Sequence, residues 1–107
     1  MKVYIVDIDE TICFYENKRE YELAKPLPER IQKINKLFDE GNRIIYWTAR
    51  GTVTGIDWRL VTEKQLSLWG AKYHQLLLNK PQYDIFIDDK AINSESFFKE
   101  LNDEKSV

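Results

Sequence analysis

Four short apolar segments recur along the chain, and each is nearly continuous instead of alternating with polar residues. They run from Val3 to Val6, Ile44 to Trp47, Leu76 to Leu78, and Ile85 to Ile87. Such runs are typical of strands that are covered on both faces, as in parallel sheets. The pattern therefore predicts about four buried parallel strands.

Segments with helical spacing separate these runs. The clearest helix begins at Pro28, which suits a first turn, and stops at Gly41. Its apolar positions are Leu27, Ile31, Ile34, Leu37 and Phe38.

Two further helices are expected. One starts at the cap residue Asp57, directs Val61 and Leu68 inward, and ends at Gly70. The other follows Asn93 or Ser94, and its apolar positions are Phe97, Phe98 and Leu101. Because strands and helices alternate, the sequence predicts an α/β fold: a three-layer, Rossmann-like parallel sheet of about four strands with flanking helices and right-handed crossovers.

Length and charge limit the possible partners. The chain has 107 residues, which is room for one core, and we expect a single domain over residues 1–107. The formal net charge of −2 comes from scattered charges of both signs, with no basic block. This argues against a nucleic-acid partner and against a membrane-surface partner.

Cysteine content and the N-terminus favour a cytoplasmic location. Cys13 is the only cysteine, so no intrachain disulfide is possible, and Cys13 with the lone His74 cannot complete a structural zinc site. Asp7 interrupts the first apolar run too early for a signal-peptide core, and no later run reaches membrane-spanning length. We expect a soluble, unprocessed protein.

Mostly polar residues follow each predicted strand within a few positions. They are Asp7, Asp9 and Thr11 after the first, Thr48, Ala49 and Arg50 after the second, Lys80 after the third, and Asp88 and Asp89 after the fourth. Ligands of open parallel sheets bind at the carboxyl ends of the strands. We therefore expect these side chains to meet in one site.

The carboxylates among these residues favour a divalent cation. Four of them in one site, Asp7, Asp9, Asp88 and Asp89, would repel one another unless a cation neutralised them. Oxygen-only ligands favour Mg²⁺, which also binds substrate phosphate. We expect Asp7, at the end of its strand, to be the nucleophile that attacks phosphorus.

The remaining strand-end residues suit supporting roles in phosphoryl transfer. Asp9 is placed to act as general acid and then as general base. Lys80 would supply a fixed positive charge, and Thr48 with backbone amides would donate hydrogen bonds to the phosphoryl oxygens. For Arg50, a substrate contact and an ion pair with a neighbouring carboxylate remain equal alternatives.

The order of these residues resembles the four motifs of haloacid-dehalogenase phosphatases. Asp7-Ile8-Asp9-Glu10-Thr11 resembles the DxDxT first motif, Trp47-Thr48-Ala49-Arg50 the second, Lys80 the third, and Ile87-Asp88-Asp89 the acidic fourth. The resemblance implies this family's core without a cap domain, a Mg²⁺ cofactor, an aspartyl-phosphate on Asp7, and Thr11, Ala49 and Arg50 as substrate-binding residues. It also implies that Asp9 binds the metal through its backbone carbonyl and that Asp88, more than Asp89, is the direct ligand.

A closer resemblance concerns residues 73–84, which are similar to small family members classed with bacterial capsule and polysaccharide biosynthesis. The leading hypothesis is therefore a Mg²⁺-dependent phosphomonoester hydrolase acting on a small metabolite such as a sugar or polyol phosphate. A nucleic-acid end phosphatase and a non-catalytic Mg²⁺- or phosphate-binding module are the alternatives.

The absence of a cap domain predicts an open site. Only a short flap, Ile12 to Lys25, follows the first motif. Because so short a flap is too small to cover a site alone, we expect a homo-oligomer in which Lys18, Arg19 or Tyr21 of a neighbouring protomer lies near the site. Cys13 has no histidine base spaced beside it and is interpreted as a small flap residue, and His74 as a packing or surface residue.

Overall fold

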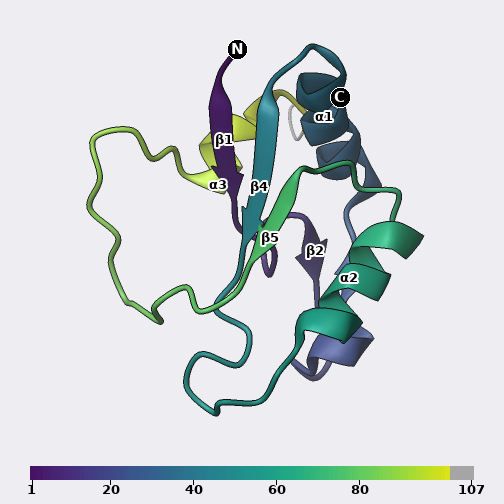
Figure 1. The fold of residues 1–107 in the computed structure, drawn as a ribbon, viewed down its shortest axis with the longest axis vertical. Helices are drawn as coiled ribbons and strands as arrows, with labels where there is room; N and C mark the ends of the chain where they lie inside the picture. Colours follow the sequence, from purple (N-terminus) through teal and green to yellow (C-terminus); the bar gives the residue numbers. More distant parts are fainter. Residues whose placement is uncertain (102–107) are drawn as a thin grey trace.

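The computed structural model of the protein describes residues 1–101 and is built on a parallel sheet (Figure 1). The sheet contains β1 (Val3–Val6), β4 (Arg43–Trp47) and β5 (Gln75–Leu77), in the order β1-β4-β5. Both pairings are parallel. These three strands match the first three predicted apolar runs to within one residue.

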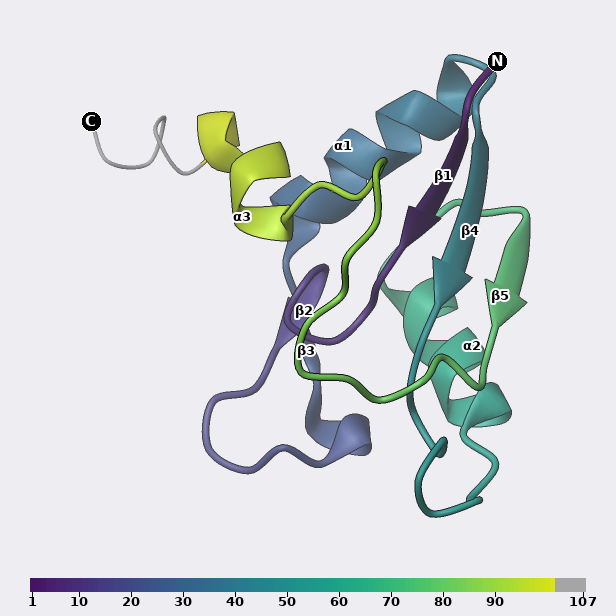
Figure 2. The same ribbon diagram turned by 90° about the vertical axis from the view of Figure 1, so that its left-hand side faces the viewer.

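Two helices form the crossovers and lie on the same face of the sheet (Figures 1 and 2). The connection from β1 to β4 contains α1 (Pro28–Asp39), and that from β4 to β5 contains α2 (Arg59–Leu68). When the strand order advances in one direction, right-handed crossovers place both helices on one face. The topology thus agrees with the α/β prediction.

The first helix forms as its sequence predicts. Pro28 occupies the first turn, and Ile31 and Ile34 are buried against the sheet. Gly41 follows the helix with a φ of 96°, a conformation that favours glycine. Periodicity and end signals agree here, so the helix was predictable.

The second helix forms and Val61 is half-buried, but Leu68 does not face inward as predicted. Leu68 is 84% exposed, whereas Thr62, Gln65 and Leu66 are buried. Two of these three are polar and bind a buried arginine described below. Because the helix buries hydrogen-bonding groups, hydrophobicity alone did not identify its inner face.

The last helix, α3 (Ser94–Phe97), packs against α1. The Asn93 side chain caps it by accepting a hydrogen bond from the backbone N–H of Glu95. Lys33 of α1 lies 4.3 Å from the Phe97 ring centroid and donates to the Phe97 carbonyl. Phe98, just beyond the helix, is buried in the main core.

The predicted fourth strand does not form. Ile85, Phe86 and Ile87 are 79%, 48% and 93% exposed, and they lie in a long segment between β5 and α3. In residues 1–101 the sheet therefore has three strands, and β1 pairs only with β4. An apolar run of strand composition still needs the hydrogen bonds of a neighbouring strand, and local propensity does not supply them.

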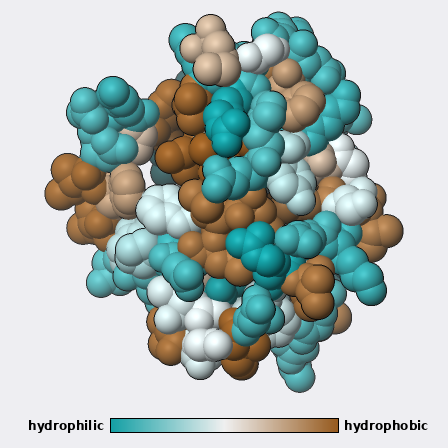
Figure 3. All heavy atoms as spheres, viewed as in Figure 1, coloured by the Kyte–Doolittle hydropathy of each residue, from teal (hydrophilic) through white to brown (hydrophobic). Residues whose placement is uncertain are grey.

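The second face of the sheet is also less covered than predicted. Val3 and Ile5 are 56% and 61% exposed, whereas Val6 and Tyr46 point into the core. Figure 3, in the view of Figure 1, shows apolar side chains at the surface on this side. The described helices lie on the opposite face, so residues 1–101 form two layers and not the predicted three.

A small flap follows the first motif. It contains β2 (Cys13–Phe14), the 3₁₀ turn η1 (Tyr21–Leu23) and β3 (Lys25–Pro26), with β2 and β3 antiparallel. An ion pair of 3.0 Å joins Lys25 to Glu16 across it. Within residues 1–101, no helix combines the length and apolar character needed to cross a membrane.

Candidate active site

A cavity of about 430 Å³ opens at the carboxyl ends of the strands. It receives side chains from the first motif, the flap, the loop after β4 and the loop after β5. The lining residues are Asp7, Asp9, Arg19, Tyr21, Ala49, Arg50, Lys80, Pro81, Gln82 and Tyr83. Five of the predicted site residues therefore share one cavity.

Asp7 presents a reachable carboxylate to this cavity. Its side chain is 37% exposed, and Oδ1 lies 3.4 Å from Nζ of Lys80. Oδ2 accepts a hydrogen bond of 3.2 Å from Oγ1 of Thr11. Thr11 reaches back because the chain turns at Glu10, whose φ is 63°, and the Thr11 N–H bonds the Ile8 carbonyl. Thr11, predicted to bind substrate, thus orients Asp7.

Lys80 is held close to Asp7 by its own backbone. Its N–H donates to the Thr48 carbonyl at 3.1 Å, and its carbonyl accepts a 2.7 Å hydrogen bond from Oγ1 of Thr52. The side chain is only 11% exposed. The loops after β4 and β5 are therefore joined directly beneath the cavity, which fixes the ammonium group beside the carboxylate of Asp7.

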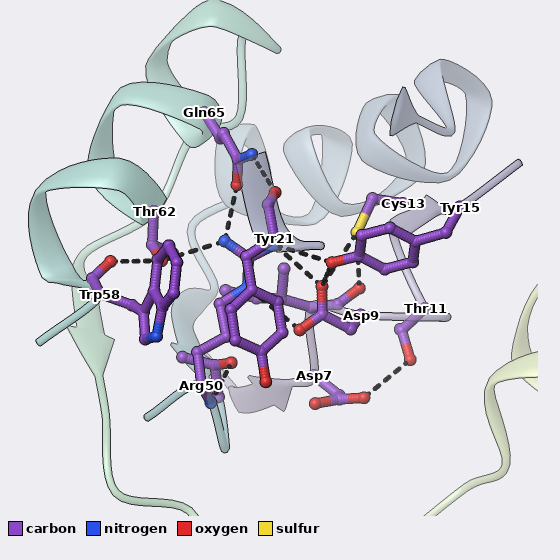
Figure 4. Close-up of polar contacts among 12 residues, drawn as sticks. Asp7, Asp9, Thr11, Cys13, Tyr15, Tyr21, Arg50, Trp58, Thr62 and Gln65 are labelled. Atoms are coloured by element: carbon purple, nitrogen blue, oxygen red, sulfur yellow. Dashed lines mark hydrogen bonds and ion pairs between the residues drawn. The ribbon is translucent and has the colours of Figure 1, made fainter. Parts of the chain in front are cut away.

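Asp9 is held by a bidentate ion pair with Arg50 (Figure 4). Nε of Arg50 donates to Oδ2 at 3.1 Å, and Nη2 donates to Oδ1 at 2.8 Å. The hydroxyl of Tyr15 also donates to Oδ1, and Sγ of Cys13 lies 3.5 Å from it. Most of the acceptor capacity of this carboxylate is therefore in use.

Arg50 is the centre of a buried network. Its side chain has no exposed surface, and Nη1 donates to Oγ1 of Thr62 at 3.1 Å and to Oε1 of Gln65 at 2.6 Å. Nε2 of Gln65 then donates to the Tyr21 carbonyl at 2.6 Å, which ties the flap to α2. Arg50 therefore forms the ion pair that was one of its two predicted roles, and it also lines the cavity.

Gly51 allows the chain to turn directly after Arg50. Its φ is 81°, and an added Cβ would lie 2.0 Å from the Ile56 carbonyl oxygen. A side chain there would displace the loop that directs the guanidinium inward. The glycine therefore supports the orientation of Arg50.

The network shifts the pKa values of its members. Burial raises the pKa of Asp9, but the hydrogen bonds and charge of Arg50, with hydrogen bonds from Tyr15 and Cys13, outweigh it and leave that pKa below its ordinary value. Burial lowers the pKa of Arg50, but the charge and hydrogen bonds of Asp9 raise it overall. In this arrangement Asp9 is an ionised carboxylate at neutral pH.

Thr48 lies beneath the cavity and not in its wall. It is 1% exposed, and its Oγ1 accepts a hydrogen bond of 3.1 Å from the backbone N–H of Arg50. Its N–H donates to the Leu77 carbonyl at 3.0 Å. The residue expected to contact phosphate therefore shapes the loop that carries Ala49 and Arg50.

Asp88 and Asp89 do not join the other acidic residues. Both are exposed, and Oδ1 of Asp88 accepts a hydrogen bond from the N–H of Lys90 in a local turn. Over the described part of the chain, no group of three or more His, Cys, Asp or Glu side chains is placed to hold a metal ion. In residues 1–101 the four carboxylates predicted to share one site are thus not gathered together, because Asp88 and Asp89 lie in the exposed segment after β5.

Four residues of the site were missed by sequence reasoning: Tyr15, Thr62, Gln65 and Tyr83. A signal existed for Thr62 and Gln65, because both lie at helical spacing from Trp58, four and seven residues along the chain, and share one helix face with it. No comparable spacing marked Tyr15. Arg19 and Tyr21, which were expected near the site from a neighbouring protomer, line the cavity of their own chain.

Two interpretations of single residues agree with the structure. Nδ1 of His74 accepts the N–H of Ile44 at 3.1 Å, and its ring stacks on Phe38, so His74 is a packing residue. Cys13 is buried, and burial followed by the charge of Asp9 raises its pKa to about 12. Such a thiol is a poor nucleophile.

Comparison with known proteins gives a fold but no family. No protein-family model matches the chain, and no curated protein is similar enough to count as a match. A crystal structure of a target protein from Vibrio cholerae is similar over 100% of both chains, with 25% sequence identity and a TM-score of 0.80. Its description names no activity. The small α/β fold is therefore shared, and the function must be argued from the site.

Proposed function

We propose that the protein hydrolyses phosphomonoesters through a phosphoryl group carried on Asp7. The observation that carries the proposal is the position of the Asp7 carboxylate: it is partly exposed in the cavity and lies 3.4 Å from Lys80. A carboxylate beside a fixed cation suits attack on phosphorus, because the cation also stabilises the charge on the transferring group.

The proposed reaction has two halves. An oxygen of Asp7 attacks phosphorus, the ester P–O bond breaks, and the leaving oxygen takes a proton from Asp9. Water then attacks the aspartyl-phosphate, gives a proton to Asp9, and releases inorganic phosphate and free Asp7. Lys80 stays beside the phosphoryl oxygens throughout.

In the observed arrangement, the ionised state of Asp9 limits the rate of the first half of the reaction, in which the leaving oxygen must be protonated. The ion pair with Arg50 lowers its pKa and disfavours the protonated form that a general acid needs. We therefore expect esters with good leaving groups to react fastest and Asp9→Asn to slow alkyl esters more than aryl esters. Equal rate losses on both would argue against the acid role.

The proposed hydrolase would use Mg²⁺ as its cofactor, as the sequence predicts. Asp7, the backbone carbonyl of Asp9, and Asp88 or Asp89 would hold it, but the acidic pair lies in the exposed segment after β5. The ion would neutralise charge on the phosphoryl group and the carboxylates.

The substrate proposal is a small phosphorylated metabolite such as a sugar or polyol phosphate, in polysaccharide synthesis. A non-catalytic phosphate-binding module is a second candidate, favoured by one observation: the Asp9 carboxylate is already engaged by Arg50 and Tyr15.

Turnover of an aryl phosphate by wild type and by Asp7→Asn tests the main proposal. We expect wild-type release of phosphate and a loss of at least about a thousandfold in Asp7→Asn, because an amide is a poor nucleophile. Asp84→Asn, an exposed position outside the cavity, is the matched control and should keep its activity. A folded Asp7→Asn protein with substantial turnover would refute the nucleophile, and no wild-type turnover would favour the binding module.

A further inference from the structure

The cavity carries more positive than negative side chains. Arg19, Arg50 and Lys80 line it against two carboxylates, Asp7 and Asp9. Each carboxylate pairs with one of these cations: Asp9 with Arg50 and Asp7 with Lys80. Among residues 1–101, Arg19 has no acidic partner, so the cavity has one cation that the protein itself does not neutralise.

Arg19 sits on the flap and is linked to the site through an aromatic ring. Its guanidinium carbon lies 5.8 Å from the centroid of Tyr15, whose hydroxyl binds Asp9. Arg50 and Lys80 lie on the loops after β4 and β5, whereas Arg19 reaches the cavity from the flap. The cavity therefore has a cation beside Asp7 and another at its flap side.

The flap side of the cavity is held in place. The ring of Tyr21 lies 4.9 Å from the guanidinium carbon of Arg50 and 5.0 Å, edge to face, from the ring of Trp58. Its carbonyl is bound by Gln65. Because these contacts fix the flap against α2, the neighbouring Arg19 does not need a second protomer to reach the site.

The volume leaves room for more than a phosphoryl group. About 430 Å³ lies within the range of small-molecule pockets. Tyr21 from the flap and Tyr83 from the loop after β5 add aromatic surface to the lining, and the Tyr83 ring centroid lies 5.3 Å from Nζ of Lys80. The volume therefore leaves room for a short organic chain beside the phosphoryl group that the proposed function places at Asp7.

We infer that the cavity selects phosphomonoesters whose alcohol portion carries a second anionic group, a carboxylate or a further phosphate, and that Arg19 is the residue that contacts this group. The inference rests on the proposed function for the placement of the first phosphoryl group at Asp7. A second anionic group would give the Arg19 guanidinium a charge-assisted hydrogen bond that no acidic side chain of residues 1–101 provides.

Binding of two unreactive phosphonates tests the inference without requiring turnover. Methylphosphonate has one anionic group, and phosphonoacetate adds a carboxylate; both are titrated by calorimetry without added metal. We expect wild type to bind phosphonoacetate about tenfold more tightly or better. In Arg19→Gln the two affinities should become nearly equal, whereas Lys18→Gln, a neighbouring flap cation outside the cavity lining, should keep the preference.

The outcomes separate the two proposals. Equal affinities in wild type, or an unchanged preference in Arg19→Gln, would overturn the role of Arg19 even if aryl phosphates are hydrolysed. An Arg19-dependent preference in a protein that hydrolyses no ester would uphold the second anion site and refute the phosphatase. Where turnover is present, Arg19→Gln should raise KM for carboxylated esters by a larger factor than KM for aryl phosphates.

Discussion

The two acidic motifs of this chain end in opposite environments. Asp9, after β1, has a side chain that is 10% exposed and bound by Arg50, Tyr15 and Cys13. Asp88, after the fourth apolar run, is exposed, and among residues 1–101 it bonds only a backbone N–H two residues away. Both motifs follow apolar segments of similar length. The difference is that β1 has a paired neighbour and residues 85–87 do not.

This contrast teaches that a strand-end motif becomes a site only when its strand is paired. Pairing of β1 with β4 fixes the loops after both strands at one edge, and the Asp9–Arg50 contact then joins residues 41 positions apart. The segment after β5 contains Ile85, Phe86 and Ile87, apolar enough for a strand, but their side chains stay exposed. The same chemistry is thus assembled in one region and left apart in the other.

The largest expected effect comes from breaking the buried ion pair. Arg50→Met should lower the free energy of unfolding by about 3–5 kcal/mol, because it leaves the Asp9 carboxylate buried without its cation. Urea unfolding measures this. The matched control is Lys72→Met, which removes an exposed pair with Asp39 and should cost less than about 1 kcal/mol. Similar losses in both variants would contradict the distinct role of the buried network.

A second experiment asks whether the exposed acidic motif acts in catalysis. If Asp88 reaches the site in the presence of Mg²⁺, Asp88→Asn should lower turnover about 10- to 100-fold and raise the Mg²⁺ concentration required. Asp89→Asn should cost less, and excess chelator should silence the wild type. Wild-type activity in Asp88→Asn at low Mg²⁺ would show that the exposed motif takes no part, and the comparison between the two motifs would then hold during catalysis as well.

The smallest expected effect comes from removing one methylene group from an isoleucine in each of two regions, the core and residues 85–87. Ile34→Val, in the core, should lower the free energy of unfolding by about 0.5–1.5 kcal/mol. Ile87→Val, at a 93% exposed position, should change it by less than about 0.5 kcal/mol. Denaturant unfolding with and without Mg²⁺ measures both. A cost at Ile87 equal to that at Ile34 would mean that residues 85–87 are buried in solution.

Much of the fold followed from local pattern. The strand runs Val3–Val6 and Arg43–Trp47, and the helix from Pro28, were predictable because period, end signals and burial agree there. The inner face of α2 was not predictable from hydrophobicity, since Thr62 and Gln65 are buried by their bonds to Arg50. Sequence reasoning also grouped Asp7, Asp9, Arg50 and Lys80 correctly, because parallel strands bring their carboxyl ends together.

The sequence by itself determined which segments are apolar, where α1 begins and ends, and which strand ends carry chemistry, because these depend on residue type and spacing along a short stretch. Tertiary structure alone decided that Arg50 pairs with Asp9 and that the flap places Arg19 and Tyr21 at the cavity. It also decided that residues 85–87 stay outside the sheet. These outcomes depend on contacts between residues far apart in the chain, whose free energies no local pattern contains.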